Sequence, residues 1–293
     1  MTALFDYASF TTRNFGFVTK DEQAKLRAAS IFVAGVGGMG GACVMALARA
    51  GVGRLIFADI DAFEISNLNR QVFAFTDTIG RPKAQATAEI LARINPEMKS
   101  ETLGGEWADR LVEIAGRVRV IVNGTDDLGA GLHLYRTARK IGVPVVDAYT
   151  APLPSVTVVR PGNPMPEERL GFPTLGKAWN AIGPDERRAA LIAEIEYVLM
   201  HSSARHHVDL GAAAEVAVGK RSRMSFAPLV IGAGVLMAQE AINCVLDRPS
   251  RTDYRGWFLN PYRPAVERPR NPLVAAVFKP IVRRFLKRMM ASA

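Results

Sequence analysis

Four glycines and a carboxylate are spaced as in a nucleotide-binding turn. The glycines are Gly35, Gly37, Gly38 and Gly40, and Asp59 stands about 20 residues further on, after an apolar run. Glycine lets a backbone approach phosphate groups closely, and the first turn of a following helix offers unpaired N–H groups to an anion. A carboxylate at this spacing can bind the ribose hydroxyls. The pattern predicts a nucleotide site, and taken alone it favours an NAD-dependent oxidoreductase.

A second group of polar residues follows this turn and carries charges suited to a triphosphate. Its members are Asp61, Asn67, Arg70, Gln71, Lys83 and Asp126. Basic side chains neutralise phosphate charge, and a carboxylate can hold a divalent cation beside it. Considered one at a time, the two basic residues could be solvated surface charges and Asp126 a helix N-cap. Considered together, they favour a site for a nucleoside triphosphate with a metal ion.

The order and spacing of these residues resemble the ThiF/MoeB/HesA family of ubiquitin-activating-type adenylyltransferases. The shared features are the GVGGMG turn, the D-x-D at 59–61, the S-N-L-N-R-Q at 66–71, the later lysine and the T-D-D at 125–127. The resemblance covers residues 10–160 and, more loosely, 223–262. It implies an enzyme that uses ATP and magnesium to adenylylate a carboxylate.

The resemblance also assigns roles to individual residues. Asp59 would bind the ribose, and Asp61 would orient the same loop. Asn67, Arg70 and Lys83 would bind the phosphates of ATP.

Three further residues receive roles in the same way. Gln71 would assist at the phosphates, and Asp126 would coordinate magnesium. Arg13, in the segment TTRNFG, would reach the γ-phosphate bound to a neighbouring subunit, which implies a homodimer. The other interpretation of Arg13 is an ordinary surface residue. The expected catalytic residues are therefore Arg13, Arg70, Lys83 and Asp126.

The cysteine and histidine content departs from that of many relatives. Cys43 and Cys244 are the only cysteines, so the zinc site of two CxxC pairs found in many relatives cannot be built, and no zinc is expected. We also expect no stable enzyme thioester, because neither cysteine lies in the crossover region. The segment with His206, His207 and Asp209 lacks an evident further ligand, and a polar surface is the favoured interpretation.

Several substrates and functions fit these observations. The favoured substrate is the C-terminus of a ubiquitin-like carrier protein or a peptide, with residues 160–180 as a pliable crossover loop. The second is threonylcarbamoyladenosine in tRNA, which similar enzymes cyclise, so tRNA is a less favoured partner. Outside this chemistry, an NAD-dependent oxidoreductase would leave Arg70, Lys83 and Asp126 without a shared purpose. An inactive scaffold would not need the whole ATP-site set.

Strands and helices must alternate to bring these residues together. β-Branched apolar runs predict strands, and segments rich in helix formers predict helices. The predicted strands begin at Ser30, Arg54, Val118 and Val143, and the predicted helices occupy 21–29, 42–53, 82–94 and 128–141. This alternation predicts an α/β fold with a doubly wound, mostly parallel, Rossmann-like sheet.

Beyond residue 150 the alternation weakens, and C-terminal β and α additions are expected. The predicted additions are a β edge near 152–159, a helix at 185–200, an apolar core helix at 226–246 and a strand at 256–262. The predicted ThiF-like domain spans 1–265, with its nucleotide-binding core at about 25–150, and a tail follows at 266–293.

The tail holds most of the net charge of +9. It contains seven basic residues and no acidic residue after Glu267, which leaves +2 for the rest of the chain. Over 272–290 the apolar residues gather near one face, which predicts a basic amphipathic helix. Such a helix could bind an anionic membrane surface or RNA, or pack on its own domain. The N-terminus lacks a signal-peptide pattern, so we expect a cytoplasmic protein that can touch the inner membrane surface.

Overall fold

A single sheet organises the computed structural model, which describes residues 5–149 and 151–291. Its eight strands follow the order β3-β2-β1-β4-β5-β6-β7-β8. The pairs among β1 to β5 are parallel, and those from β5 to β8 are antiparallel. The strands are β1 Ser30–Ala34, β2 Arg54–Ala58, β3 Lys99–Leu103, β4 Val120–Asn123, β5 Val145–Asp147, β6 Ser155–Val159, β7 Trp257–Asn260 and β8 Ala265–Glu267. The predicted mostly parallel sheet with C-terminal β additions is confirmed.

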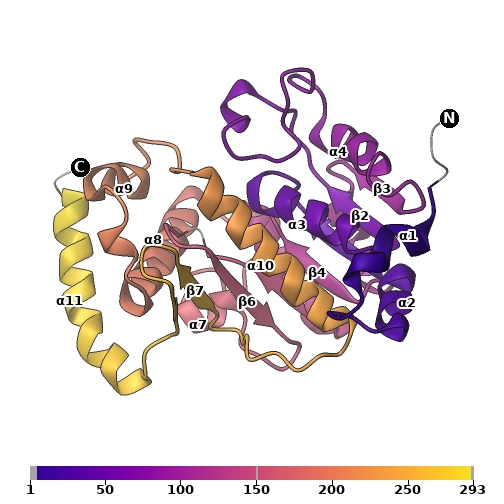
Figure 1. Cartoon of the computed structure of the whole chain (residues 1–293). Coiled ribbons are helices and arrows are strands. Elements are labelled where there is room, and N and C mark those ends of the chain that lie inside the picture. The colour runs from indigo at the N-terminus through magenta and orange to yellow at the C-terminus, as the bar shows by residue number, and fades with distance from the viewer. Residues whose placement is uncertain (1–4, 150, 292–293) are drawn as a thin grey trace.

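Helices cover both faces of the sheet (Figure 1). One core cluster joins the sheet to α2, α3, α4 and α10, a second joins it to α5 and α6, and a smaller third joins β7 to α8. The helices are α1 Tyr7–Thr11, α2 Lys20–Ala28, α3 Gly38–Arg49, α4 Lys83–Ala92, α5 Trp107–Ala115, α6 Leu128–Ile141, α7 Pro166–Leu170, α8 Pro184–His201, α9 Leu210–Ala217, α10 Ala227–Val245 and α11 Pro272–Ala291. The fold is therefore the doubly wound arrangement that the alternation predicts.

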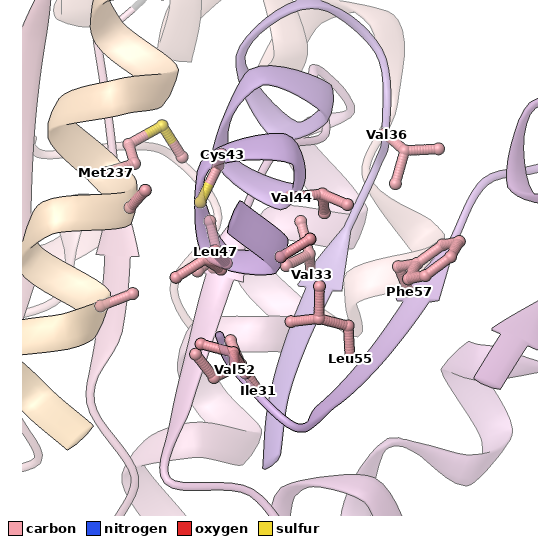
Figure 2. Close-up of a cluster of buried hydrophobic side chains, with 14 of the residues drawn as sticks. Ile31, Val33, Val36, Cys43, Val44, Leu47, Val52, Leu55, Phe57 and Met237 are labelled. Carbon is pink, nitrogen blue, oxygen red and sulfur yellow. The ribbon is translucent and has the colours of Figure 1, made fainter. Parts of the chain in front are cut away.

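The helix after the glycine turn is held in place by a buried apolar cluster. Figure 2 shows Cys43 and Leu47 of α3 on the side facing Met237 of α10, with Val44 turned toward the strands. The two helices approach so closely that a Cβ on Gly234 would lie 2.3 Å from the Met39 carbonyl oxygen. This packing fixes the N-terminus of α3, where the glycine turn lies.

The apolar helix α10 has the length and composition of a membrane span. In the structure it contacts α3, β4, β5 and β6, as the core-helix prediction requires. It begins one residue before Pro228, and Glu240, which interrupts its apolar run, is buried and accepts hydrogen bonds from Ser250 and Thr252.

Several elements differ from the sequence predictions. The strand predicted to begin at Arg54 ends at Ala58, so Asp59 and Asp61 lie in the loop that follows. The elements β3 and α5 were not predicted. Of the β3 residues only Leu103 is buried, and an exposed edge strand of this kind carries no apolar run by which to recognise it. The predicted domain ranges also include residues 1–4 and 292–293, which lie outside the described residues.

The segment predicted as a pliable crossover loop contains the short helix α7. Arg136 of α6 forms two hydrogen bonds to the carboxylate of Glu167, at 2.8 and 2.6 Å, and Arg139 pairs with Glu168. Glu167 is 1% exposed; burial would raise its pKa, but the bonds from Arg136 and Thr174 lower it overall. Hydrogen bonds and ion pairs therefore hold α7 against α6.

Candidate functional site

The glycine turn joins β1 to α3 and has almost no room for side chains. Gly35 has a φ of +85°, which favours glycine, and a Cβ on Gly40 would lie 1.9 Å from the Gly35 carbonyl oxygen. Gly124, after β4, closes the turn from the other side, since its own Cβ would lie 2.6 Å from that oxygen. The turn and the carboxyl end of β4 are thus in direct contact.

Asp59 ties the loop after β2 to the glycine turn. Its Oδ2 accepts a hydrogen bond from the Val36 backbone N–H at 2.9 Å, and its Oδ1 accepts one from the Asp61 N–H at 3.0 Å. Burial raises the pKa of this carboxyl, and the two backbone donors oppose that rise. A carboxylate has about four acceptor positions, so Asp59 can still accept from ribose hydroxyls.

Lys83 is a buried cation at the start of α4. The residue is 6% exposed. Its Nζ lies 3.0 Å from Oδ2 of Asp61, whose side chain is largely exposed. The interpretation of Lys83 as a solvated surface charge is therefore wrong. Because Asp61 is bonded to Asp59, which is bonded to Val36, a continuous chain of contacts connects this ammonium group to the glycine turn.

The segment after the D-x-D places Arg70 beside the glycine turn, whereas Asn67 bonds within its own segment. Asn67 closes the 3-10 turn Ile65–Asn67, because its Oδ1 accepts from the Glu64 N–H at 3.1 Å. Arg70 donates to the Ser66 carbonyl oxygen at 2.8 Å, and its Cγ lies 4.0 Å from where a Cβ on Gly38 would stand. Both side chains therefore take part in local hydrogen bonds.

Gln71 is the residue of this segment with an unmet hydrogen-bonding need. It is 7% exposed, and its amide lies 3.5 Å from where a Cβ on Gly37 would stand. Within the described ranges, its Oε1 is buried without a partner. A buried acceptor without a donor costs free energy, so a ligand or water beside Gly37 would stabilise it.

The two aspartates of the T-D-D sequence are used differently. Asp127 is the N-cap of α6, accepting from the Ala130 N–H at 2.7 Å, and it pairs with Arg187 of α8. Asp126 is exposed, and in the described part of the chain its carboxylate takes part in no hydrogen bond or ion pair. The N-cap interpretation belongs to Asp127, which leaves Asp126 available for a cation.

A cavity of about 120 Å³ begins beside Asp126 and extends over the carboxyl ends of β4 and β5. At its floor Asp147 accepts hydrogen bonds from the Tyr135 hydroxyl at 2.5 Å and from the Asn123 amide at 2.9 Å. Burial raises the pKa of Asp147 to about 7, against the lowering effect of those two bonds. In α/β sheets, ligands bind at this edge.

Arg169 of α7 forms part of the cavity wall. It donates to the Tyr149 hydroxyl at 2.7 Å, and its guanidinium carbon lies 4.4 Å from the centre of the Tyr197 ring. Its Nε and Nη1 are buried and lack acceptors within the described residues. The cavity wall therefore combines aromatic side chains with a guanidinium group whose Nε and Nη1 are available to donate hydrogen bonds to a ligand.

Arg13 is not brought to the glycine turn of its own chain. It lies in the 3-10 helix Thr12–Asn14, and the neighbouring Asn14 donates to the carbonyl oxygen of Ala50, the C-cap of α3. α3 has 12 residues, so at about 1.5 Å per residue the turn is about 18 Å away. Arg13 therefore does not reach the glycine turn of its own chain.

Neither cysteine is placed as a nucleophile. Cys43 is fully buried, which raises the pKa of its thiol strongly, and burial also raises the pKa of Cys244 to about 11. The thiolate is the reactive form of cysteine, and burial disfavours it at both positions.

The segment with His206, His207 and Asp209 has structural contacts. Asp209 is the N-cap of α9, and His207 stacks on Tyr262. Among the described residues no three His, Cys, Asp or Glu side chains are grouped to hold a metal ion.

Sequence reasoning missed several residues that shape this site. Gly124 directly precedes the T-D-D at 125–127 and could have been recognised as a position of close approach. The ion pair between Asp127 and Arg187 and the cavity position of Arg169 join segments far apart in the chain, and nothing in the local sequence marks them.

Comparison with known proteins adds the following similarities. The model of the ThiF family matches residues 11–273. The sulfur carrier protein ThiS adenylyltransferase of Escherichia coli (strain K12) is 31% identical over 132 residues, which are 45% of this chain and 53% of that protein. The tRNA threonylcarbamoyladenosine dehydratase of Bacillus subtilis (strain 168) is 30% identical over 142 residues, 48% and 56% of the two chains. The chain thus spans about half the length of the curated relatives it matches.

Solved structures show the same fold. PaaA has a TM-score of 0.60 at 18% identity, covering 92% of this chain and 77% of its own. E. coli MccB with ATP has a TM-score of 0.59 at 18% identity, covering 86% and 67%.

Proposed function

Because this chain belongs to the ThiF family, we propose that it activates a carboxylate with ATP as an acyl-adenylate. A carboxylate oxygen attacks the α-phosphorus, and the bond to the departing pyrophosphate breaks. The observation that carries the proposal is the position of three charged residues relative to the glycine turn. Arg70 lies beside Gly38, and Lys83 is linked to the turn through the D-x-D. Asp126 directly follows Thr125, whose backbone nitrogen adjoins Gly35. A dinucleotide-dependent oxidoreductase would need the turn and Asp59 but not this charge set.

The chain's own residues divide the work of binding and orientation. Asp59 accepts from the ribose, the α3 N-terminus and Gln71 face the phosphates, and Lys83 and Arg70 offset their charge. The exposed, unbonded carboxylate of Asp126 fits magnesium, which would neutralise phosphate charge when bound there.

For the acyl substrate we propose the C-terminus of a ubiquitin-like carrier protein or a peptide. The cavity between Asp126 and Arg169 lies at the correct edge of the sheet, and its tyrosines and guanidinium suit an extended backbone with spare carbonyl oxygens. Since both thiols are held protonated, a separate nucleophile would take the acyl group directly from the adenylate.

The second candidate substrate is a nucleoside in tRNA. One relative is a tRNA dehydratase, and the basic C-terminal helix offers charge for RNA phosphates. In that case the adenylated carboxylate would be carried by a tRNA nucleoside rather than by a protein terminus.

The proposed function is tested first by calorimetric titration with ATP plus magnesium and, separately, with NAD. We expect saturable ATP binding and none for NAD; binding of NAD alone would overturn the proposal. Pyrophosphate release is then measured with a peptide ending in a free Gly-Gly carboxylate, with its C-terminal amide as control, and with total tRNA. Release with the acid but not the amide supports a protein terminus, and release with tRNA alone supports the second class.

We further propose a homodimer in which Arg13 of one subunit serves the site of the other. Arg13→Ala should lower affinity for magnesium-ATP by about 10-fold, because a charged hydrogen bond contributes roughly 1.5–3 kcal/mol. In a mixed dimer of one Arg13→Ala subunit and one Asp126→Asn subunit, one site has both the Arg13 guanidinium and the Asp126 carboxylate. The other site has neither group. Titration should therefore find one tight site per mixed dimer, and none in either homodimeric variant. A monomeric protein, or the absence of a restored site, would contradict the proposal.

A further inference from the structure

The C-terminal helix α11 packs through one face only. It contacts α8 and α9, with Val282 and Leu286 buried against them and Arg283 paired to Glu196 at 2.9 Å. In Figure 1, α11 forms one end of the molecule, outside α8 and α9. The helix is therefore part of the folded domain, and its outer face is accessible.

The outer face carries an apolar stripe. Leu273, Val277 and Ile281 are 79%, 67% and 58% exposed, and their spacing of four places them along one side of the helix. They do not complete the core, because the buried positions of α11 lie on the opposite side. Three large aliphatic side chains in an exposed row indicate a surface that is covered by another apolar phase.

Basic residues continue the same face toward the C-terminus. Arg284 and Arg288 lie three and seven positions after Ile281 and are exposed. In the described part of the chain neither takes part in an ion pair, and residues 268–293 contain no acid that could supply one from the helix itself. The occupant of this face must therefore combine apolar and anionic character.

A hollow of about 320 Å³ adjoins the stripe between α11 and the end of α8. Ile281 and Phe278 line it on the helix side, and Arg205, Arg268 and Arg270 contribute guanidinium groups. The carboxylate of Glu267, which also lines the hollow, is already bonded to Ser203 and Asn260. Arginine forks match phosphate oxygens, so the hollow suits an anionic headgroup next to acyl chains.

We propose that α11 docks this protein on the surface of an anionic lipid bilayer, with the apolar stripe inserted among the acyl chains. An amphipathic helix lies in the plane of the interface, which a helix on the outside of the molecule can do without unfolding the domain. This inference is independent of the adenylation site, because α11 contacts α8 and α9, whereas the glycine turn lies between β1 and α3.

The test is co-sedimentation of the full chain with vesicles of phosphatidylcholine alone or mixed with phosphatidylglycerol. We expect binding to the mixed vesicles only, weakening as salt increases. The variant Leu273→Glu/Val277→Glu/Ile281→Glu should lose roughly 100-fold in partitioning, since apolar insertion is replaced by charge repulsion. Arg284→Gln/Arg288→Gln should lose roughly 25-fold, about fivefold per charge removed.

The matched control is Phe17→Glu/Val112→Glu/Ile141→Glu, which changes net charge equally at scattered exposed apolar positions. It should retain vesicle binding, and all variants should keep wild-type ATP affinity. Equal loss in the control, no binding of the wild type, or displacement from vesicles by total tRNA would overturn the proposal. The proposal would also be overturned if the wild type did not bind vesicles and formed a dimer that dissociates in Leu273→Glu/Val277→Glu/Ile281→Glu. The apolar stripe would then be an interface between two copies of the chain.

Discussion

Asp126→Asn should lower the affinity for ATP in the presence of magnesium by roughly 100-fold, since a metal bridging to phosphate contributes several kcal/mol and 1.4 kcal/mol is tenfold. In EDTA, the variant and the wild type should bind ATP equally, because the lost group acts through the cation. The melting temperature should not fall, as the carboxylate is exposed and makes no bond within the described chain. Calorimetry with and without magnesium measures the first two quantities.

The neighbouring residue provides an isosteric control. Asp127→Asn keeps the N-cap of α6, since asparagine caps as well as aspartate, but loses the charge that pairs with Arg187. Its affinity for magnesium-ATP should stay within a few-fold of wild type. If Asp127→Asn removes the magnesium dependence and Asp126→Asn does not, the metal role has been assigned to the wrong aspartate.

Lys83→Met should weaken ATP binding by 10- to 100-fold, since a hydrogen bond to a charged group contributes roughly 1.5–3 kcal/mol. Methionine retains most of the buried aliphatic packing, and the ion-pair partner Asp61 is mostly exposed. The melting temperature should therefore fall by less than about 3 °C, because pairs with an exposed partner contribute roughly 1 kcal/mol or less. Binding of adenosine, which has no phosphates, should be unchanged.

Asp61→Asn separates a phosphate role from a structural one. This variant breaks the same ion pair and leaves the Lys83 ammonium in place. If Lys83 binds phosphate, ATP affinity should stay near wild type in Asp61→Asn and fall in Lys83→Met. Equal losses in both variants would mean that the pair only holds the D-x-D loop against α4. Lys83→Arg is expected to restore part of the affinity, since it restores the charge with different geometry.

The core of the fold could be predicted from the sequence because its signals are local. The buried strands β1, β2 and β4 are short apolar runs, and the range of helix α6 was predicted to the residue. The edge strand β3 was missed, since mostly exposed polar residues are held there by pairing with β2. Such pairing depends on a distant segment and leaves no pattern in five residues.

By itself, the sequence determined the β–turn–α unit, the carboxylate after β2 and the charged residues that we propose bind a triphosphate. It could do so because glycine conformation, strand pattern and charge act over a few residues. Only the tertiary structure decided which aspartate of the T-D-D is free, that Lys83 is buried beside Asp61, and that Arg13 lies at the far end of α3. It also decided that α11 both packs on its domain and leaves an apolar stripe in solvent. Apart from the N-cap bond of Asp127, which joins residues three positions apart, these outcomes depend on contacts between segments far apart in the chain, which no local pattern encodes.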